Sequence, residues 1–197
     1  DWGRDAMISL PGLALATGRP EVARTILATF AHHIDRGMVP NFFPDHGETP
    51  EYNSADAALW FFQAVRSYHE ATEDDAFLAE MYPVLEDIGA WYERGTRHGI
   101  AVDPEDGLLR AGEEGVSLTW MDAKVGDWVV TPRIGKPVEI NALWYNALTT
   151  MAHFARRLKR SPESLEAQAA RVETGFARFW NPAAGCLFDV LDGPGGH

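Results

Sequence analysis

Six stretches of the chain carry apolar residues at three- and four-residue spacing, a period that lets a helix bury one face. We therefore expect six helices, near residues 5–17, 22–34, 59–65, 77–91, 143–158 and 165–179. Local stop and start signals agree with this division. Gly18 suits the end of the first helix, and Pro20 suits the first turn of the second.

The connections between these helices alternate between short and long. The short ones are residues 17–20, 72–75 and 159–162, and the long ones are residues 36–53, residues 99–137 and the tail from 181. Long loops in a compact domain are usually functional or disordered. Because short and long connections alternate, all the long loops should emerge at one end. The pattern predicts an all-α fold of three helical hairpins, which is half of a six-hairpin (α/α)6 toroid.

The composition favours a neutral ligand. With 197 residues, 46% of them hydrophobic, the chain can bury a sizeable core as one domain or as part of a larger one. The formal net charge of -12 argues against nucleic acid or an anionic membrane surface as a partner. No apolar run approaches the roughly 18 residues of a membrane span. Cys186 is the single cysteine, which indicates a reducing compartment such as the cytoplasm.

Acids and tryptophans occur together in two segments where no helical or strand period explains them. Residues 118–128 read LTWMDAKVGDW, and residues 139–145 read EINALWY. Indole faces stack on the apolar faces of pyranose rings, and carboxylates accept hydrogen bonds from hydroxyls. A carboxyl that stays protonated can also donate its proton to a glycosidic oxygen. This mixture predicts a sugar-cleaving pocket.

Asp122 is the candidate for the catalytic acid. Its neighbours Trp120, Met121 and Ala123 would favour the protonated carboxyl by desolvation. The alternative is a loop acid that pairs with Lys124 or Arg133.

Further candidates lie where the long loops meet the helices. The predicted substrate-binding residues are Trp2, Arg4, Asp5, Tyr52, Asn53, Asp56, Trp60, Trp120, Lys124, Trp128, Glu139, Asn141 and Trp144. Asp56 and Trp60 share a helical face, with Ser54 as the expected cap. Each has a structural alternative: a capping or ion-paired Asp5, a core Trp60, or a carboxylate of Asp56 or Glu139 that complements a helix dipole. We expect no metal and no cofactor, because there is no Gly-rich phosphate loop, Cys–His spacing or nucleophile elbow.

Five segments, in this order, resemble the glucosidase domain of glycogen debranching enzymes, the amylo-alpha-1,6-glucosidases. They are GRDAMISLPGL (3–13), VPN (39–41), YNSAD (52–56), TWMDA (119–123) and VEINALWY (138–145). The resemblance spans residues 1 to about 192. It implies an (α/α)6 barrel and an inverting hydrolysis of the single α-1,6-linked glucose left at a branch point of glycogen, another branched α-glucan or a limit dextrin. It also implies that Asp122 is the general acid and that Arg4, Asp5, Tyr52, Asp56, Trp60, Trp120 and Glu139 hold the terminal glucose.

The chain departs from the family's pattern in one respect. The family's general base is a glutamate that should follow the region of residues 187–190 and is absent from this sequence. We therefore expect residues 1–197 to be part of a single (α/α)6 glucosidase catalytic domain whose closing half carries the base, and to be inactive alone. Glu139 is a weaker candidate for a substitute base.

Other functions stay open. One is a related inverting α-glucosidase, glucoamylase-like or trehalase-like. Another is a non-catalytic carbohydrate-binding helical module, and a third is a helical scaffold without a ligand. The sequence leaves the oligomeric state open.

Overall fold

The computed structural model describes residues 2–42 and 49–196 of the chain. All six predicted helices are present, and a π-helical segment (Pro11–Leu15) continues the first of them. The helices are α1 (Gly3–Leu10), α2 (Pro20–His32), α3 (Ala57–Thr72), α4 (Asp75–Arg94), α5 (Val138–Arg157) and α6 (Glu163–Phe176). Two short 3-10 turns follow helices α4 and α6, at Arg97–Gly99 and Ala177–Phe179.

The helix boundaries follow the local signals. Gly18 has a φ of +70° between the first two helices, in the left-handed region that glycine adopts without strain. Asp74 caps α4, since its side chain accepts a hydrogen bond from Phe77 N at 2.9 Å. The Ser54 hydroxyl accepts a hydrogen bond from Ala57 N, the first residue of α3, at 3.1 Å, although the residue at the N-cap position is Asp56.

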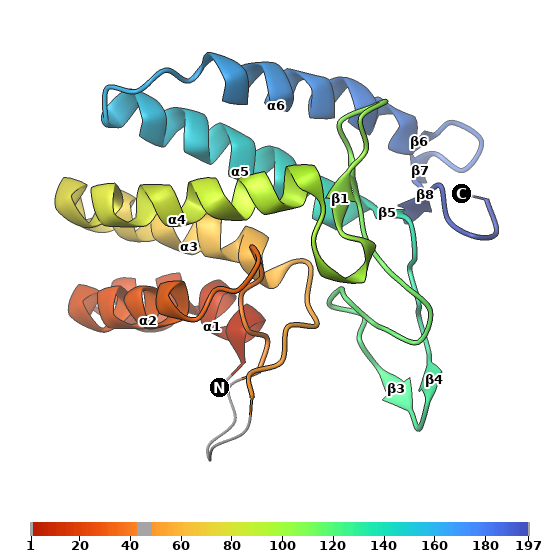
Figure 1. The fold of residues 1–197 in the computed structure, drawn as a ribbon, viewed down its shortest axis with the longest axis horizontal. Helices are drawn as coiled ribbons and strands as arrows, with labels where there is room; N and C mark the ends of the chain where they lie inside the picture. The colour runs from red at the N-terminus through yellow and green to blue at the C-terminus, as the bar shows by residue number, and fades with distance from the viewer. Residues whose placement is uncertain (1, 43–48, 197) are drawn as a thin grey trace.

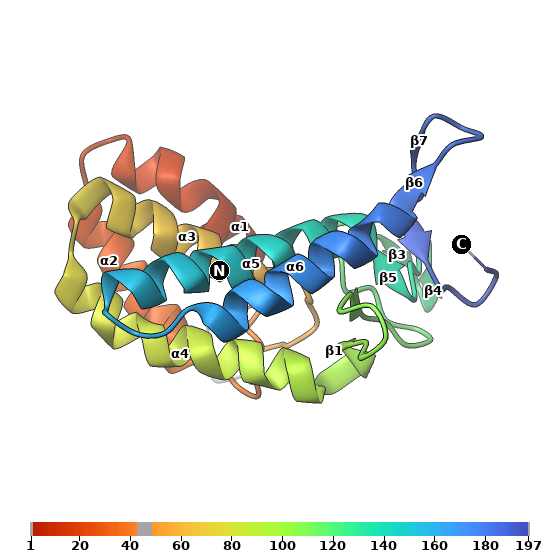
Figure 2. The same cartoon turned by 90° about the horizontal axis from the view of Figure 1, so that it is seen from above.

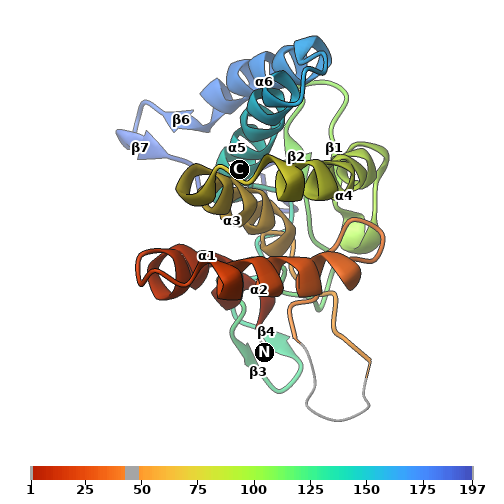
Figure 3. The same ribbon diagram turned by 90° about the vertical axis from the view of Figure 1, so that its left-hand side faces the viewer.

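The short and long connections lie at opposite ends of the helices. In Figure 1 the α1–α2, α3–α4 and α5–α6 connections lie on the left, and the α4–α5 connection and the tail after α6 lie on the right. Helix α3 packs against α1, α2, α4 and α5, so its buried residues form the centre of the core. Seen from the end in Figure 3, α3 and α4 lie between the α1–α2 pair and the α5–α6 pair. No helix in the described part of the chain has both the length and the apolarity to cross a membrane.

The long loops contain strands. Among the described residues these form four antiparallel pairs, β1–β2, β3–β4, β5–β8 and β6–β7. Their bounds are β1 (Ala101–Val102), β2 (Leu109–Arg110), β3 (Lys124–Val125), β4 (Trp128–Val129), β5 (Lys136–Pro137), β6 (Trp180–Asn181), β7 (Cys186–Leu187) and β8 (Val190–Leu191). In Figure 2 the β6–β7 hairpin projects beyond the end of α6. The β5–β8 pair joins the tail to the segment just before α5.

The prediction of an all-α fold, and of an (α/α)6 toroid with it, is therefore wrong. Gly107, Gly126 and Gly185 have φ values of +77°, +61° and +68°, and each lies between two paired strands. Glycine at these positions lets the chain reverse tightly, so the flanking residues pair. Each strand has only two residues, which is too short for the alternation that identifies a strand in a sequence.

Candidate active site

Glycine at position 3 lets the start of α1 lie close to the first long loop. Gly3 N donates to Asn41 O at 2.9 Å. A Cβ at Gly3 would lie 2.1 Å from Pro40 O, closer than any side chain allows. This contact places Arg4, the next residue of α1, beside the loop that leads into α3.

Arg4 joins two carboxylates that are far apart in the sequence. Its Nε donates to Asp56 Oδ1 at 2.9 Å and to Oδ2 at 2.8 Å. Its Nη1 donates to Asp122 Oδ2 at 2.8 Å. Burial lowers the pKa of the guanidinium, but the two aspartates more than offset this and hold it above its usual value. We call Arg4, Ser54, Asp56 and Asp122 the Arg4 cluster.

Asp56 is the buried member of the Arg4 cluster, with 2% of its side chain exposed. The Ser54 hydroxyl donates to Asp56 Oδ1 at 2.5 Å. Burial raises the pKa of the Asp56 carboxyl, and Arg4 and Ser54 oppose that shift only in part. Asp56 is therefore a fixed anchor for Arg4 more than a freely accessible carboxylate.

Asp122 is the accessible member, with 47% of its side chain exposed. Trp120 beside it is 58% exposed. The described residues therefore do not provide the desolvation that the sequence suggested for Asp122. It forms an ion pair with Arg4, and not with Lys124 or Arg133 as the structural alternative had it. Lys124 Nζ instead donates to Gly115 O at 2.8 Å.

Tyr52 and Asn53 precede the Arg4 cluster and are partly committed to structural contacts. The Tyr52 hydroxyl donates to His33 O at 2.8 Å. Asn53 Oδ1 accepts from Asn41 Nδ2 at 3.1 Å, and its Nδ2 donates to Glu51 Oε2 at 3.0 Å. Both side chains are half-buried, and the loop next to Asp56 is held by these bonds.

A second charged cluster surrounds Glu139 at the start of α5. Arg133 is buried, and its guanidinium pairs with both Glu139 and Asp189 and donates to Thr119. The sequence pointed to Arg133 only as a partner for Asp122, and it did not single out Thr119 or Asp189. One signal was present, because Thr119 directly precedes Trp120 in the acid- and indole-rich segment.

Two of the remaining predicted substrate-binding residues have buried side chains. Asn141 is fully buried and hydrogen-bonds Leu109 N, Leu109 O and Pro137 O, so it is not presented to a ligand. Trp144 is also buried, 2% exposed, in the core. Both side chains lie in the core, and a contact of either residue with a sugar stays a prediction.

Four other predicted residues are partly or largely exposed. Trp60 is half-buried against the core. Trp2 is 55% exposed and lies against Phe42, with 5.0 Å between the ring centroids. Trp128 is 63% exposed in β4. Asp5 is exposed and lines a groove between α1 and α2.

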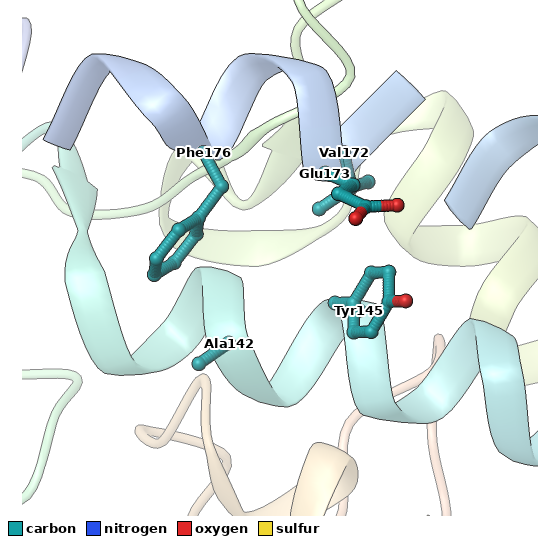
Figure 4. A pocket seen from close by; sticks show the side chains of 5 residues that line it. All are labelled: Ala142, Tyr145, Val172, Glu173 and Phe176. Carbon is teal, nitrogen blue, oxygen red and sulfur yellow. The ribbon is translucent and has the colours of Figure 1, made fainter. Parts of the chain in front are cut away.

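A separate pocket of about 260 Å³ lies between α5 and α6. Figure 4 shows Tyr145 of α5 facing Glu173 of α6, with Phe176 farther along the same helix. No member of the Arg4 cluster lines this pocket. Among the described residues, no group of three or more His, Cys, Asp and Glu side chains is arranged to hold a metal ion.

Known structures share this fold at low sequence identity. A GH78 family rhamnosidase of Bacillus sp. GL1 has a TM-score of 0.68 and 19% identity, over 96% of this chain and 19% of that one. A rhamnosidase from Klebsiella oxytoca with rhamnose bound has a TM-score of 0.63 and 17% identity, over 89% of this chain and 32% of that one. An uncharacterized conserved protein from Thermus thermophilus has a TM-score of 0.70 and 18% identity, over 94% of this chain and 57% of that one. These similarities concern the fold alone.

The similarities in sequence identify a family, which the structural similarities do not. The glycogen debranching enzyme of Saccharomyces cerevisiae is 46% identical over 67 residues, which are 34% of this chain and 4% of the yeast protein. The chain thus spans much less than two thirds of that relative. The family model for amylo-alpha-1,6-glucosidase matches residues 1–195. That match extends over almost all of the sequence, and the chain belongs to the amylo-alpha-1,6-glucosidase family.

Proposed function

We propose that residues 1–197 contribute the general acid, and the residues that position it, to a glycosidase site that removes α-1,6-linked glucose from glycogen or a related branched α-glucan. The observation that carries this proposal is the bridge from Arg4 to Asp56 and Asp122. It joins three of the segments on which the family resemblance rests. The exposed indole of Trp120 next to Asp122 offers a face for a sugar ring.

In this proposal Asp122 is the general acid. Its carboxyl is exposed enough to meet a glycosidic oxygen, whereas Asp56 is not. Asp122 donates its proton to that oxygen as the bond to the sugar carbon breaks, and the leaving group departs as an alcohol. Trp120 binds the sugar through stacking, and Arg4 holds the Asp122 carboxyl in position through its hydrogen bond.

The same proposal assigns inversion of configuration to the reaction. Inversion needs a second carboxylate about 6.5 to 9.5 Å from the acid, with a water between them. Both Glu139 oxygens accept hydrogen bonds from Arg133, so Glu139 is already engaged in holding that guanidinium and is the weaker candidate for the base. We therefore take the general base from a glutamate outside residues 1–197, as the family resemblance implies. Residues 1–197 alone should then release no glucose. A cytoplasmic location stays a prediction.

Glucose release from a phosphorylase limit dextrin tests the proposal in the full-length protein. Asp122→Asn keeps the size of the side chain but removes the acid, so we expect kcat to fall by about 10²- to 10⁴-fold with sugar binding retained. Asp127→Asn is the matched control, because Asp127 is an exposed acid of the same segment. Its kcat should equal that of the unmodified protein.

The result separates the proposal from its competitors. Hydrolysis of linear α-1,4-glucan or trehalose in preference to the branch point would favour a glucoamylase-like or trehalase-like enzyme. Sugar binding without hydrolysis, unchanged by Asp122→Asn, would favour a carbohydrate-binding module. Full activity of Asp122→Asn on the limit dextrin would exclude Asp122 as the acid.

A further inference from the structure

Arg133 is a buried guanidinium that none of the proposed steps uses. It lies between β4 and β5, and the residue is 7% exposed. Its φ is +41°, in the left-handed region that residues other than glycine seldom adopt. Such a backbone conformation persists only where surrounding contacts hold it in place.

The hydrogen bonds of Arg133 leave it no donor for a ligand. Its Nε donates to Asp189 Oδ2 at 2.9 Å, and its Nη1 donates to Thr119 Oγ1 at 3.1 Å and to Glu139 Oε1. Its Nη2 donates to Glu139 Oε2 at 2.6 Å and to Asp189 Oδ1 at 2.7 Å. A guanidinium has five N–H groups, so each one is matched by an acceptor. Direct sugar binding by Arg133 would require one of these bonds to break.

The neighbours of Arg133 include the segment that carries the proposed acid. Thr119 is followed by Trp120, Met121 and Asp122. On the other side of Thr119, Leu118 O accepts from Ala55 N at 2.8 Å, next to Asp56. Residues 118–122 are thus held at Leu118 by the backbone, at Thr119 by Arg133 and at Asp122 by Arg4.

We propose that Arg133 is a positioning residue, which fixes residues 118–122 against the start of α5 so that Asp122 and Trp120 meet the sugar in the correct geometry. This rests on the proposed function of Asp122. Arg133 does not contact the substrate in this proposal, and it acts through Thr119 and Glu139. Burial lowers the pKa of the Arg133 guanidinium, but its hydrogen bonds and ion pairs with Glu139 and Asp189 raise it by more. The pKa therefore lies above the usual value, and the group stays charged.

Two substitutions in the full-length protein remove this link in different ways. Arg133→Lys keeps the positive charge, but an ammonium cannot reproduce the planar set of five donors. Thr119→Val removes only the hydroxyl that ties the acid-bearing segment to Arg133. Arg178→Lys is the matched control, because the ion pairs of Arg178 in the described part of the chain are with Asp106 and Asp192, outside the acid-bearing segment. The measurements are kcat and KM on limit dextrin and amide hydrogen exchange of residues 118–122.

We expect Arg133→Lys and Thr119→Val to lower kcat by about ten- to a hundredfold and to change KM by less than about threefold, because misplacement costs mainly the reactive geometry. Exchange of the amides in residues 118–122 should become faster in both variants, and Arg178→Lys should alter neither quantity. Values of kcat within about twofold of the unmodified protein in both variants would overturn the inference.

Hydrogen exchange separates this inference from the proposed function. If the unmodified protein releases no glucose, the proposed function fails, and exchange alone decides whether Arg133 holds the segment. Faster exchange confined to residues 118–122 in both variants then supports the positioning. Unchanged exchange there, or an equal increase in Arg178→Lys, overturns it.

Discussion

Replacing Lys136 with methionine should destabilise the protein, and the loss should be smaller in acid. Lys136 lies in β5, and its side chain is 3% exposed. Its Nζ lies 2.9 Å from Asp103 Oδ2, 2.9 Å from Asp106 Oδ2 and 2.8 Å from Asp192 Oδ2. Methionine fills a similar space but leaves three neighbouring carboxylates without their shared cation. Arg178 would still pair with Asp106 and Asp192.

The burial of the partners sets the size of the effect. Removing one partner of a buried ion pair typically costs about 3 to 5 kcal/mol. Asp103 and Asp106 are 21% and 13% exposed, but Asp192 is 43% exposed and water can solvate it. With Arg178 retained, we expect the lower end, about 3 kcal/mol at pH 7. For a domain of this size that is a fall in Tm of about 6 to 12 °C.

The pH dependence follows from the direction of the pKa shifts. A hydrogen bond from the Glu105 backbone and the nearby Lys136 lower the pKa of Asp103. Lys136 and then Arg178 lower the pKa of Asp192. Carboxyls with lowered folded-state pKa values contribute stability above their ordinary pKa of 3.8, and that stability is lost as the pH falls through the folded-state pKa. The difference between Lys136→Met and the unmodified protein should therefore shrink as the pH falls below 3.8 and through the folded-state pKa values of these carboxyls.

Guanidinium and thermal unfolding at pH 7 and pH 3 measure both effects. Lys124→Met is the control, because Lys124 is exposed and its Nζ contacts only Gly115 O in the described residues. The control should change the free energy of unfolding by less than about 0.5 kcal/mol. The reasoning is refuted if Lys136→Met is within about 1 kcal/mol of the control at pH 7, or if its loss is equally large at both pH values.

Three further predictions concern packing and exposure. Gly3→Ala should lower the free energy of unfolding, measured by chemical denaturation, by about 1 to 3 kcal/mol, because the added Cβ would lie 2.1 Å from Pro40 O. An unchanged free energy of unfolding would contradict that close contact. Asn141→Ala should lower the free energy of unfolding by about 2 to 4 kcal/mol in the same assay, because it leaves the buried backbone N–H and C=O of Leu109 without partners. Glucan binding should weaken only to the extent that less of the protein is folded. Trp128→Ala should leave Tm within about 1 °C because Trp128 is 63% exposed, and a larger fall would show a packing role.

The helices were predictable because their signal repeats many times. Helix α4 extends over 20 residues, so its apolar stripe recurs over several turns, and Asp74 caps its start. The strands lacked such a signal. A two-residue strand such as β3 depends on the turn at Gly126 and on its partner β4, and neither contact leaves a period in the sequence.

The site was predictable as a set of segments but not as a set of contacts. Asp122 lies 118 residues from Arg4, so no local spacing identifies that pair. The burial of Asn141 could have been predicted, because it shares a helical face with Trp144 and Leu148, both of which are buried. Glu139, two residues earlier, points to a different side of α5 and reaches Arg133.

The side-chain exposures in the Arg4 cluster separate the buried residues, which hold the others in place, from the exposed carboxylate, which a sugar can contact. Asp56 is 2% exposed and Arg4 11%, whereas Asp122 is 47% exposed. A precise site needs accessible groups held by inaccessible ones. Asp56 and Ser54 fix the guanidinium, and the guanidinium orients the exposed carboxylate. Some of the predicted substrate-binding side chains, Asp56 among them, are therefore used to hold the exposed carboxylate that a sugar can reach.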